Sequence, residues 1–455
     1  MKVPVSPPKY QKLLTTVLKS GTERFQRLMR GSPIDQKGRY LHWDKLRHLT
    51  PPEDLSSEAW WFSVKTARLG LYRQLPLMDK FNNRFQFATP DLILRELHWL
   101  DRYASGNIQS NDAITNSQTR NTYLIRSLIE EAISSSQLEG AAITRDVAKE
   151  MIRQDRQPKN NSEQMILNNY HAMQFIREIK NEPLTPSIVF ELHKILTLNT
   201  LAETAVGRFR SEADEIHVVD NATREDLHIP PPADELPIRM QRLCSFANQN
   251  DDTESGDAFL HPVIRSIALH FMLAYDHPFC DGNGRTSRAL FYWSMLQQGY
   301  WLMEFVSISE IIKHAQEQYN KAFLYTETDD NDVTYFLIHQ LNVIHKAVDA
   351  LHAYLDQKMQ EISEAERMLI DNPRLSGKLN FRQMALLRHA LKNPHFSYVV
   401  QEHQRSHGIS YDVARKDLLE MADALELLIK TKQGRRYYFV APRDLDQRIA
   451  ATSES

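Results

Sequence analysis

The chain has 455 residues, of which 42% are hydrophobic and 25% are charged, and this composition is ordinary for a folded soluble protein. Its 55 Lys and Arg residues nearly balance 58 Asp and Glu residues, so net charge excludes a chain that binds nucleic acid over its whole surface. Two cysteines exclude a disulfide framework and a Cys-rich zinc site. The start, MKVPVSPPKYQK, lacks the apolar core of a signal peptide, and no apolar run approaches the roughly 18–20 residues of a membrane span. We therefore expect a cytoplasmic protein with no membrane partner.

Apolar residues at three- and four-residue spacing predict that most of the chain is helical. The expected helices cover residues 119–138, 187–197, 262–276, 286–298, 309–325 and 333–356. The candidate strand is EIHVVD at 215–220, which precedes the extended HIPPP at 228–232, where prolines exclude helix. We expect residues 213–232 to form a hairpin or flap over a helical body.

Polar stretches at 104–118, 156–163, 248–257 and 371–378 mark the joints between these elements. The sequence predicts an all-α fold in three parts. These are an N-terminal helical segment (1–85), a helical core (86–370) and a small C-terminal domain (371–455).

The segment HPFCDGNGRTSR, residues 277–288, predicts a site for a phosphorylated ligand. Gly282 and Gly284 permit left-handed backbone angles, so successive N–H groups can form an anion-binding nest. The following helix adds free N–H donors, and Arg285 and Arg288 lie three residues apart on one of its faces. Asp281 beside a phosphate is costly unless a cation such as Mg²⁺ lies between them. The loop therefore indicates a polyphosphate together with a metal ion.

Other readings of this segment are weaker. A Walker loop needs Lys and then Ser or Thr after its last glycine, and a dinucleotide fingerprint needs a preceding strand. His277 at the mouth of the nest could accept a proton from a hydroxyl, although it could instead cap the preceding helix. A metal pair of His270 and His277 lacks a third ligand, and Cys280 lacks a partner that would activate it.

The whole segment resembles the signature of the Fic family, His-Pro-Phe-x-Asp/Glu-Gly-Asn-Gly-Arg-x-x-Arg, at every specified position. The likeness covers roughly residues 85–350. It includes EAISSSQLEGAAIT (131–144), NNYHAMQFI (168–176), LHKIL (192–196), GRFR (207–210), HIPPP (228–232) and HPVIRSIALHF (261–271).

Fic proteins transfer AMP from ATP to a hydroxyl of a target protein and release diphosphate. The resemblance implies that His277 is the general base and that Asp281 binds Mg²⁺. It also implies that residues of the same segment bind the phosphates of ATP, with Arg285 and Arg288 at the β- and γ-phosphates. The nucleotide-binding residues that it implies are Asp281, Gly282, Asn283, Gly284, Arg285, Thr286, Ser287 and Arg288.

Two further positions follow from the resemblance. Tyr319 resembles the family tyrosine near the adenine, although its usual tyrosine neighbour is Asn320 here. The flap at 213–232 would hold a target segment by strand addition, and the alternative is a solvent-exposed hairpin.

SSQLEG, residues 135–140, resembles the inhibitory motif Ser/Thr-x-x-x-Glu-Gly/Asn of one class of this family. The resemblance implies an inhibitory helix at 119–140 whose Glu139 pairs with Arg288, while Ser135 and Gly140 shape the helix end. A carboxylate can occupy the face that the arginine would offer to a phosphate. The alternative is a terminal glutamate with Gly140 as the helix C-cap.

The C-terminal domain carries a local positive charge, with 12 Lys and Arg against 6 Asp and Glu between residues 374 and 442. Residues 409–428 predict a helix capped by Ser410, and 429–442 predict a basic hairpin. This arrangement resembles a winged helix that exposes Arg415 and Lys416 on the helix and Arg435 and Arg436 on the wing. DNA binding, dimerisation and docking of a target protein all stay open.

The sequence thus predicts an autoinhibited protein adenylyltransferase that uses ATP and Mg²⁺. Its acceptor would be a Ser, Thr or Tyr hydroxyl of a target protein or of the chain itself, and the chain could form a homodimer. Three alternatives stay open: a DNA-binding regulator whose nucleotide site is a sensor, an enzyme with another phosphate donor, and removal of AMP from modified targets.

Overall fold

The computed structural model describes residues 2–52, 55–105, 117–220, 223–249, 259–370, 377–433 and 436–451. Arg435 and parts of the joints expected at 104–118, 248–257 and 371–378 lie outside these ranges. The chain divides into two compact units. The first contains residues 1–108, 131–142 and 160–347, and the second contains residues 109–130, 143–159 and 348–455.

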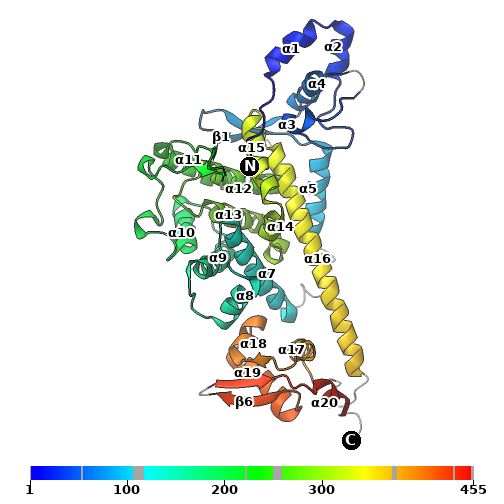
Figure 1. Cartoon of the computed structure of the whole chain (residues 1–455), viewed down its shortest axis with the longest axis vertical. Helices are drawn as coiled ribbons and strands as arrows, with labels where there is room; N and C mark the ends of the chain where they lie inside the picture. Colours follow the sequence, from blue (N-terminus) through cyan, green and yellow to red (C-terminus); the bar gives the residue numbers. More distant parts are fainter. Residues whose placement is uncertain are drawn as a thin grey trace. The chain divides into compact units, whose positions relative to one another are not determined.

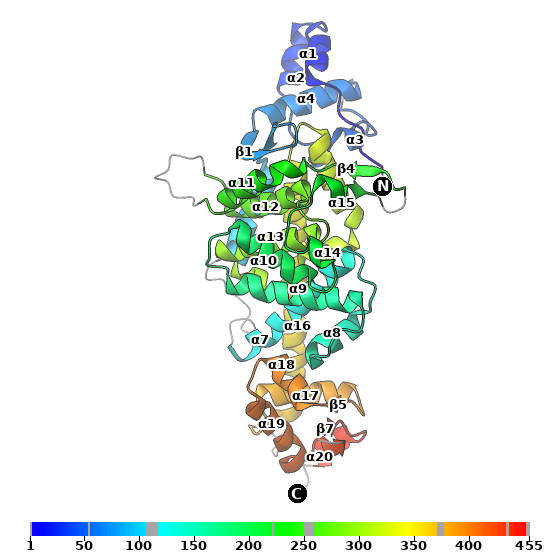
Figure 2. The same ribbon diagram turned by 90° about the vertical axis from the view of Figure 1, so that its left-hand side faces the viewer.

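The first unit is built around two central helices, α12 (Pro262–Asp276) and α13 (Asn283–Gln297). Helices α11 (Leu236–Ala247), α12, α13 and α9 (Asn161–Glu178) lie in succession, and α10 (Pro186–Thr197) packs on α9 (Figures 1 and 2). Nearly every side chain of α12 and α13 is buried, as expected for helices that are covered on all sides. The loop between them is therefore held by the most rigid part of the unit.

Several expected helices are confirmed, and one is wrong. Residues 309–325 form two helices, α14 (Ile308–His314) and α15 (Gln316–Thr328), because Ala315 adopts φ −143° and ψ 42° and interrupts the helical backbone. Helix α16 (Thr334–Ile370) continues well past the expected end at 356, and α13 begins at Asn283 rather than at 286 because Gly282 forms its N-cap.

The flap is a short antiparallel hairpin of β3 (Val218–Val219) and β4 (Asp226–His228). The strand expected over 215–220 is reduced to two residues. Glu215, at φ +46°, ends the 3₁₀ turn η2 (Glu212–Asp214) in a left-handed conformation, so the extended backbone begins only after it.

The N-terminal part begins with helices α1 (Tyr10–Leu18), α2 (Thr22–Met29), α3 (Trp43–Leu46) and α4 (Ser57–Leu69), which share an apolar cluster. The segment expected to be helical to residue 85 ends instead in a hairpin of β1 (Arg73–Met78) and β2 (Arg84–Phe87). Asp79 explains this turn, because its carboxylate accepts hydrogen bonds from the backbone N–H groups of Phe81 and Asn83. Helix α5 (Asp91–Ala104) follows.

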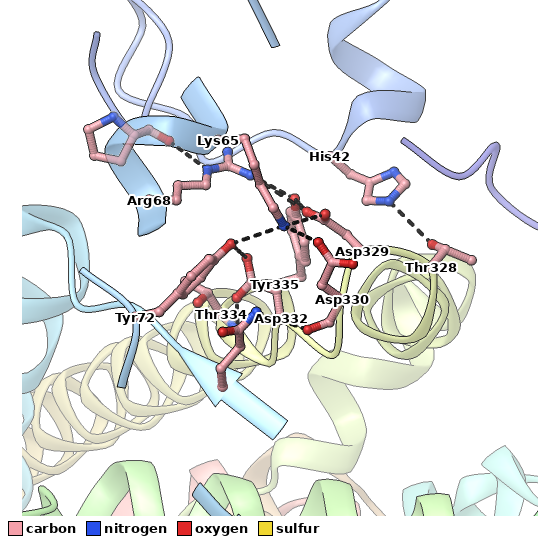
Figure 3. Close-up of polar contacts among 12 residues, drawn as sticks. His42, Lys65, Arg68, Tyr72, Thr328, Asp329, Asp330, Asp332, Thr334 and Tyr335 are labelled. Atoms are coloured by element: carbon pink, nitrogen blue, oxygen red, sulfur yellow. Dashed lines mark hydrogen bonds and ion pairs between the residues drawn. The ribbon is translucent and has the colours of Figure 1, made fainter. Parts of the chain in front are cut away.

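A buried polar network joins α4 to the turn between α15 and α16 (Figure 3). Lys65 Nζ lies 2.5 Å from Asp329 Oδ1 and 3.1 Å from Asp330 Oδ2. Arg68 Nη1 donates to the Tyr335 hydroxyl at 2.7 Å. The charges of Lys65, Arg68 and Asp329 are buried but paired, whereas Asp330 is exposed. The network therefore fixes the N-terminal part against the end of α15.

The second unit contains the first part of α7 (Ser117–Leu138), α8 (Arg145–Gln154) and the end of α16. Its C-terminal elements are α17 (Phe381–Lys392), β5 (Ser397–Tyr398), α18 (Val400–His407), α19 (Tyr411–Leu419), β6 (Ile429–Gln433), β7 (Arg436–Val440) and α20 (Leu445–Ala451). The sheet order is β5-β7-β6, and an apolar cluster that includes Leu418 and Phe439 forms the core. A helix capped by Ser410 and a hairpin thus lie where the sequence predicted them, and the likeness to a winged helix stays a prediction.

None of the helices in the described ranges combines the length and the apolar content that crossing a bilayer requires.

Candidate active site

The loop from His277 to Gly282 is shaped by left-handed residues and by the side chain of Asn283. His277 (φ +45°) ends α12, and Gly282 (φ +81°) begins α13. The Asn283 amide accepts a hydrogen bond from Phe279 N at 2.9 Å and donates one to Phe279 O at 2.8 Å. Phe279 is fully buried and stacks on His193, so it packs in the core.

A cavity of about 200 Å³ opens beside this loop. The flap, the end of α12, the start of α13 and one face of α15 line it, together with the end of α7. The lining residues that the sequence had singled out are Glu139, His277, Gly284, Arg288 and Tyr319.

His277 faces this cavity as a neutral imidazole. Burial lowers its pKa to about 4, and a hydrogen bond with the backbone only partly opposes this effect. Its Nδ1 lies 3.3 Å from Ala274 O, an acceptor, so Nδ1 carries the proton and Nε2 is left as the basic nitrogen. Arg210 holds the backbone here, because its Nε donates to His277 O at 2.8 Å. The ring can therefore accept a proton at neutral pH.

Arg288 is buried and held by the end of α7. Its Nε donates to Ser135 Oγ at 2.9 Å, and its Nη2 donates to Ser135 O at 3.1 Å and to Glu139 Oε1 at 2.8 Å. The Glu139 carboxylate lies against Gly284, where an added Cβ would come within 2.1 Å of Oε1. The expected pairing of Glu139 with Arg288 is thus present, and Gly140 (φ +95°) follows it in a left-handed turn.

Arg285 does not accompany Arg288 to the cavity. It is buried, and its Nη1 donates to Leu196 O at 2.9 Å while its Nη2 donates to Asp281 Oδ2 at 3.1 Å. The Asp281 side chain is 51% exposed. The loop therefore holds Arg285 together with Asp281, whereas Arg288 alone of the two arginines lines the cavity.

Thr286 and Ser287 use their hydroxyls within the helix. Thr286 Oγ1 donates to Gly282 O and Ser287 Oγ donates to Gly284 O. Both side chains thus stabilise the first turn of α13.

Tyr319 lies at the α15 side of the cavity, and its hydroxyl is 2.9 Å from His270 Nε2. The lining residues that the sequence had not singled out include His228 and Glu327. His228 Nδ1 lies 2.8 Å from Glu327 Oε2, and its Nε2 lies 2.7 Å from Tyr275 O. These two contacts hold the His228 ring from both sides. HIPPP was recognised as a segment, but no sequence signal links it to Glu327.

Residues 183–295 match the model of the Fic/DOC family. The chain is 31% identical over 131 residues to protein adenylyltransferase Fic of Drosophila virilis, which is 28% of this chain and 24% of the relative. It is 33% identical over 133 residues to the protein of the same name from Aedes aegypti, covering 28% and 23%. The chain thus spans about a quarter of the length of the curated relatives that it matches.

Solved structures give weaker likenesses. A Fic family protein from Desulfovibrio desulfuricans G20 has a TM-score of 0.47 at 20% identity, over 77% of this chain and 96% of the other. Fic-1 from C. elegans has a TM-score of 0.45 at 16% identity, over 77% and 97%.

Proposed function

We propose that this chain, which carries a Fic/DOC family domain at residues 183–295, is a protein adenylyltransferase that transfers AMP from ATP to a Ser, Thr or Tyr hydroxyl of a target protein. The observation that carries the proposal is a neutral imidazole, that of His277, and a buried guanidinium, that of Arg288, on one cavity. Several relatives named protein adenylyltransferase Fic match part of the chain.

In this mechanism the cavity binds the nucleotide, and His277 Nε2 accepts the proton of the attacking hydroxyl. The hydroxyl oxygen bonds to the α-phosphorus while the bond to the β-phosphate oxygen breaks, and diphosphate leaves. Arg288 would neutralise the terminal phosphate once Glu139 has moved away.

The residues present fit a magnesium ion that binds together with the nucleotide. Within the described ranges no group of three or more His, Cys, Asp or Glu side chains could hold a metal by itself. Magnesium usually takes only one or two protein carboxylates and completes its shell with phosphates and water. The exposed carboxylate of Asp281 would be that ligand, and the ion would offset charge on the departing diphosphate.

We further propose that Glu139 inhibits this activity. Its carboxylate accepts a hydrogen bond from Nη2 of Arg288 and fills the space over Gly284. A phosphate therefore cannot accept a hydrogen bond from the same nitrogen while Glu139 is in place. The same carboxylate could instead orient a water molecule for removal of AMP from a modified target, which is the alternative activity.

The test is incubation with ATP and Mg²⁺, followed by intact-mass measurement for an added AMP. Glu139→Gly is expected to label itself at least tenfold faster than the wild type, because Arg288 is released. Glu139→Gly combined with His277→Ala is the matched control and should show no added mass. Equal labelling of all three proteins would refute the proposal.

Removal of AMP is tested by adding wild-type chain to purified, labelled Glu139→Gly protein that has been freed of ATP. If the added mass is lost only when the added chain carries Glu139, the result would favour the alternative activity over transfer.

A second candidate function concerns the C-terminal domain. Helix α19, capped by the Ser410 hydroxyl, exposes Arg415 and Lys416, and the hairpin exposes Lys432 and Arg436. We propose that these cations bind the phosphates of duplex DNA. Affinity for a duplex should fall steeply with salt, and Arg415→Ala with Lys416→Ala should make that dependence shallower. Salt-independent or absent binding would leave this domain a protein-binding module.

A further inference from the structure

The second unit contains a cavity of about 170 Å³, nearly as large as that of the candidate active site. Helices α7, α8, α17 and α18 and the strand β5 all contribute to its wall. The lining residues are Thr122, Arg153, Ala385, Leu386, His389, Phe396, Tyr398, Val399, Glu402, His403, Ser406 and His407.

Two opposite charges line this cavity, that of the half-buried Glu402 and that of the exposed Arg153. Glu402 is half-buried, and no described residue donates a hydrogen bond to its carboxylate or forms an ion pair with it. Burial raises the pKa of Glu402, and the nearby Arg153 guanidinium acts in the opposite direction. In the part of the chain that the structure describes, the Arg153 side chain has no acceptor either, and only its backbone carbonyl is bonded, by Arg405.

The histidines of the wall already have partners. His389 Nδ1 is 2.7 Å from the Tyr398 hydroxyl, and His407 Nδ1 is 3.1 Å from Thr122 Oγ1. Burial lowers the pKa of both rings, to about 3 for His407, so both are neutral. Glu402 and Arg153 are therefore the charges that a ligand would meet.

Ala385, Leu386, Phe396 and Val399 give the lining an apolar part, beside the hydroxyl groups of Thr122, Tyr398 and Ser406. An apolar cavity of about 150 Å³ is large enough for benzene. The cavity therefore has room for one aromatic ring or a branched aliphatic group, with charged groups available beside it.

We propose that this cavity binds a small zwitterion with an apolar body, the chemical class of a free amino acid with an aromatic or branched aliphatic side chain. The ammonium group pairs with Glu402, the carboxylate pairs with Arg153, and the side chain packs against Leu386 and Phe396. Each charge of the ligand thus meets an opposite charge that forms no hydrogen bond or ion pair with a described side chain.

The test is calorimetric titration of the whole chain with three probes that share one ring: L-phenylalanine, 2-phenylethylamine and 3-phenylpropanoate. L-phenylalanine should bind about tenfold more tightly than either singly charged probe, since one charge-assisted contact is lost in each. In Glu402→Gln that advantage over 3-phenylpropanoate should vanish, and in Arg153→Gln the advantage over 2-phenylethylamine should vanish.

Asp412→Asn and Arg443→Gln are matched controls, because they remove the same charges from exposed positions of the same unit and should leave all three affinities unchanged. L-leucine is the aliphatic probe and should follow L-phenylalanine. Absence of binding by both amino acids at millimolar concentration, or equal binding of L-phenylalanine to wild type and Glu402→Gln, would overturn the proposal. Because the readout is binding alone, its result does not depend on the adenylylation proposal.

Discussion

Replacing Lys65 by methionine removes one charge from the buried network of Figure 3 and keeps the length and the apolar stem of the side chain. The Lys65 side chain is only 4% exposed, and that of Asp329 is 1% exposed. Without the ammonium group, the Asp329 carboxylate keeps the Tyr335 hydroxyl at 2.8 Å and Arg68 at 4.0 Å. Breaking a buried ion pair costs about 3–5 kcal/mol, and these remaining contacts favour the lower end.

The loss should depend on pH. Burial would raise the pKa of Asp329, but the ammonium of Lys65 and the guanidinium of Arg68 hold it below its usual value. In the wild type this carboxylate therefore stabilises the fold above its unfolded pKa, and the contribution is lost as the pH falls through the folded pKa. In Lys65→Met, burial without the ammonium raises the pKa of Asp329. At lower pH this carboxylate therefore becomes protonated, and no unpaired negative charge is left buried. The difference between variant and wild type should shrink from pH 8 to pH 5.

The assay is thermal unfolding of the whole chain followed by calorimetry at both pH values. About 3 kcal/mol corresponds to a fall of about 6 °C for a unit of this size. Lys321→Met is the matched control, because among the described residues Lys321 pairs only with an exposed glutamate one turn away, and its loss should leave the midpoint unchanged. Asp329→Asn in the Lys65→Met background should recover part of the loss at pH 8. A deficit equal to that of the control, or one that does not change with pH, would refute the reasoning.

Three other outcomes are expected. The low pKa of His277, about 4, predicts that the rate of self-labelling by the Glu139→Gly chain stays constant from pH 8 to about pH 5 and falls only below pH 5. The measurement is the initial labelling rate at low ATP concentration. Gly31→Ala should lower the free energy of unfolding by about 1–3 kcal/mol, seen as a lower unfolding midpoint, because the added Cβ would lie 2.8 Å from a backbone oxygen of α4. Gly70→Ala is its control and should be neutral, because the Cβ there meets no atom closer than 3.8 Å. Asp417→Asn should destabilise the C-terminal domain by about 2–4 kcal/mol, because three side chains donate to a carboxylate whose pKa they hold below its usual value; limited proteolysis followed by mass measurement will report this loss.

The sequence predicted the loop at 277–288 because its conformation depends on local residues. A left-handed glycine at 282, an asparagine that bonds back to Phe279 and a helix start are all encoded within a few positions. The end of α7 was predicted for the same reason, as Ser135, Glu139 and Gly140 lie within one and a half turns.

What the sequence did not predict depends on residues far apart in the chain. The pairing of His228 with Glu327 joins positions 99 residues apart, and Lys65 meets Asp329 across 264. No glycine or proline marks the helix interruption at Ala315 in the sequence, and the amphipathic pattern continues on both sides of it. The sequence therefore predicted one helix there. Arg285 and Arg288 share a helix face by spacing, yet tertiary acceptors at Leu196 and Ser135 draw them apart.

Gly284 connects substrate binding to inhibition in the proposed function. A glycine in a phosphate loop permits close approach of an anion to the backbone, and here the anion that uses this space is the Glu139 carboxylate. If the proposed function holds, phosphate and carboxylate would compete for one place and for one donor, Nη2 of Arg288. Competition of this kind is a matter of relative affinity, so inhibition should weaken as the ATP concentration rises. The wild-type labelling rate should then approach that of Glu139→Gly at saturating ATP, and a constant ratio between them at all concentrations would mean that Glu139 acts on the transfer step itself.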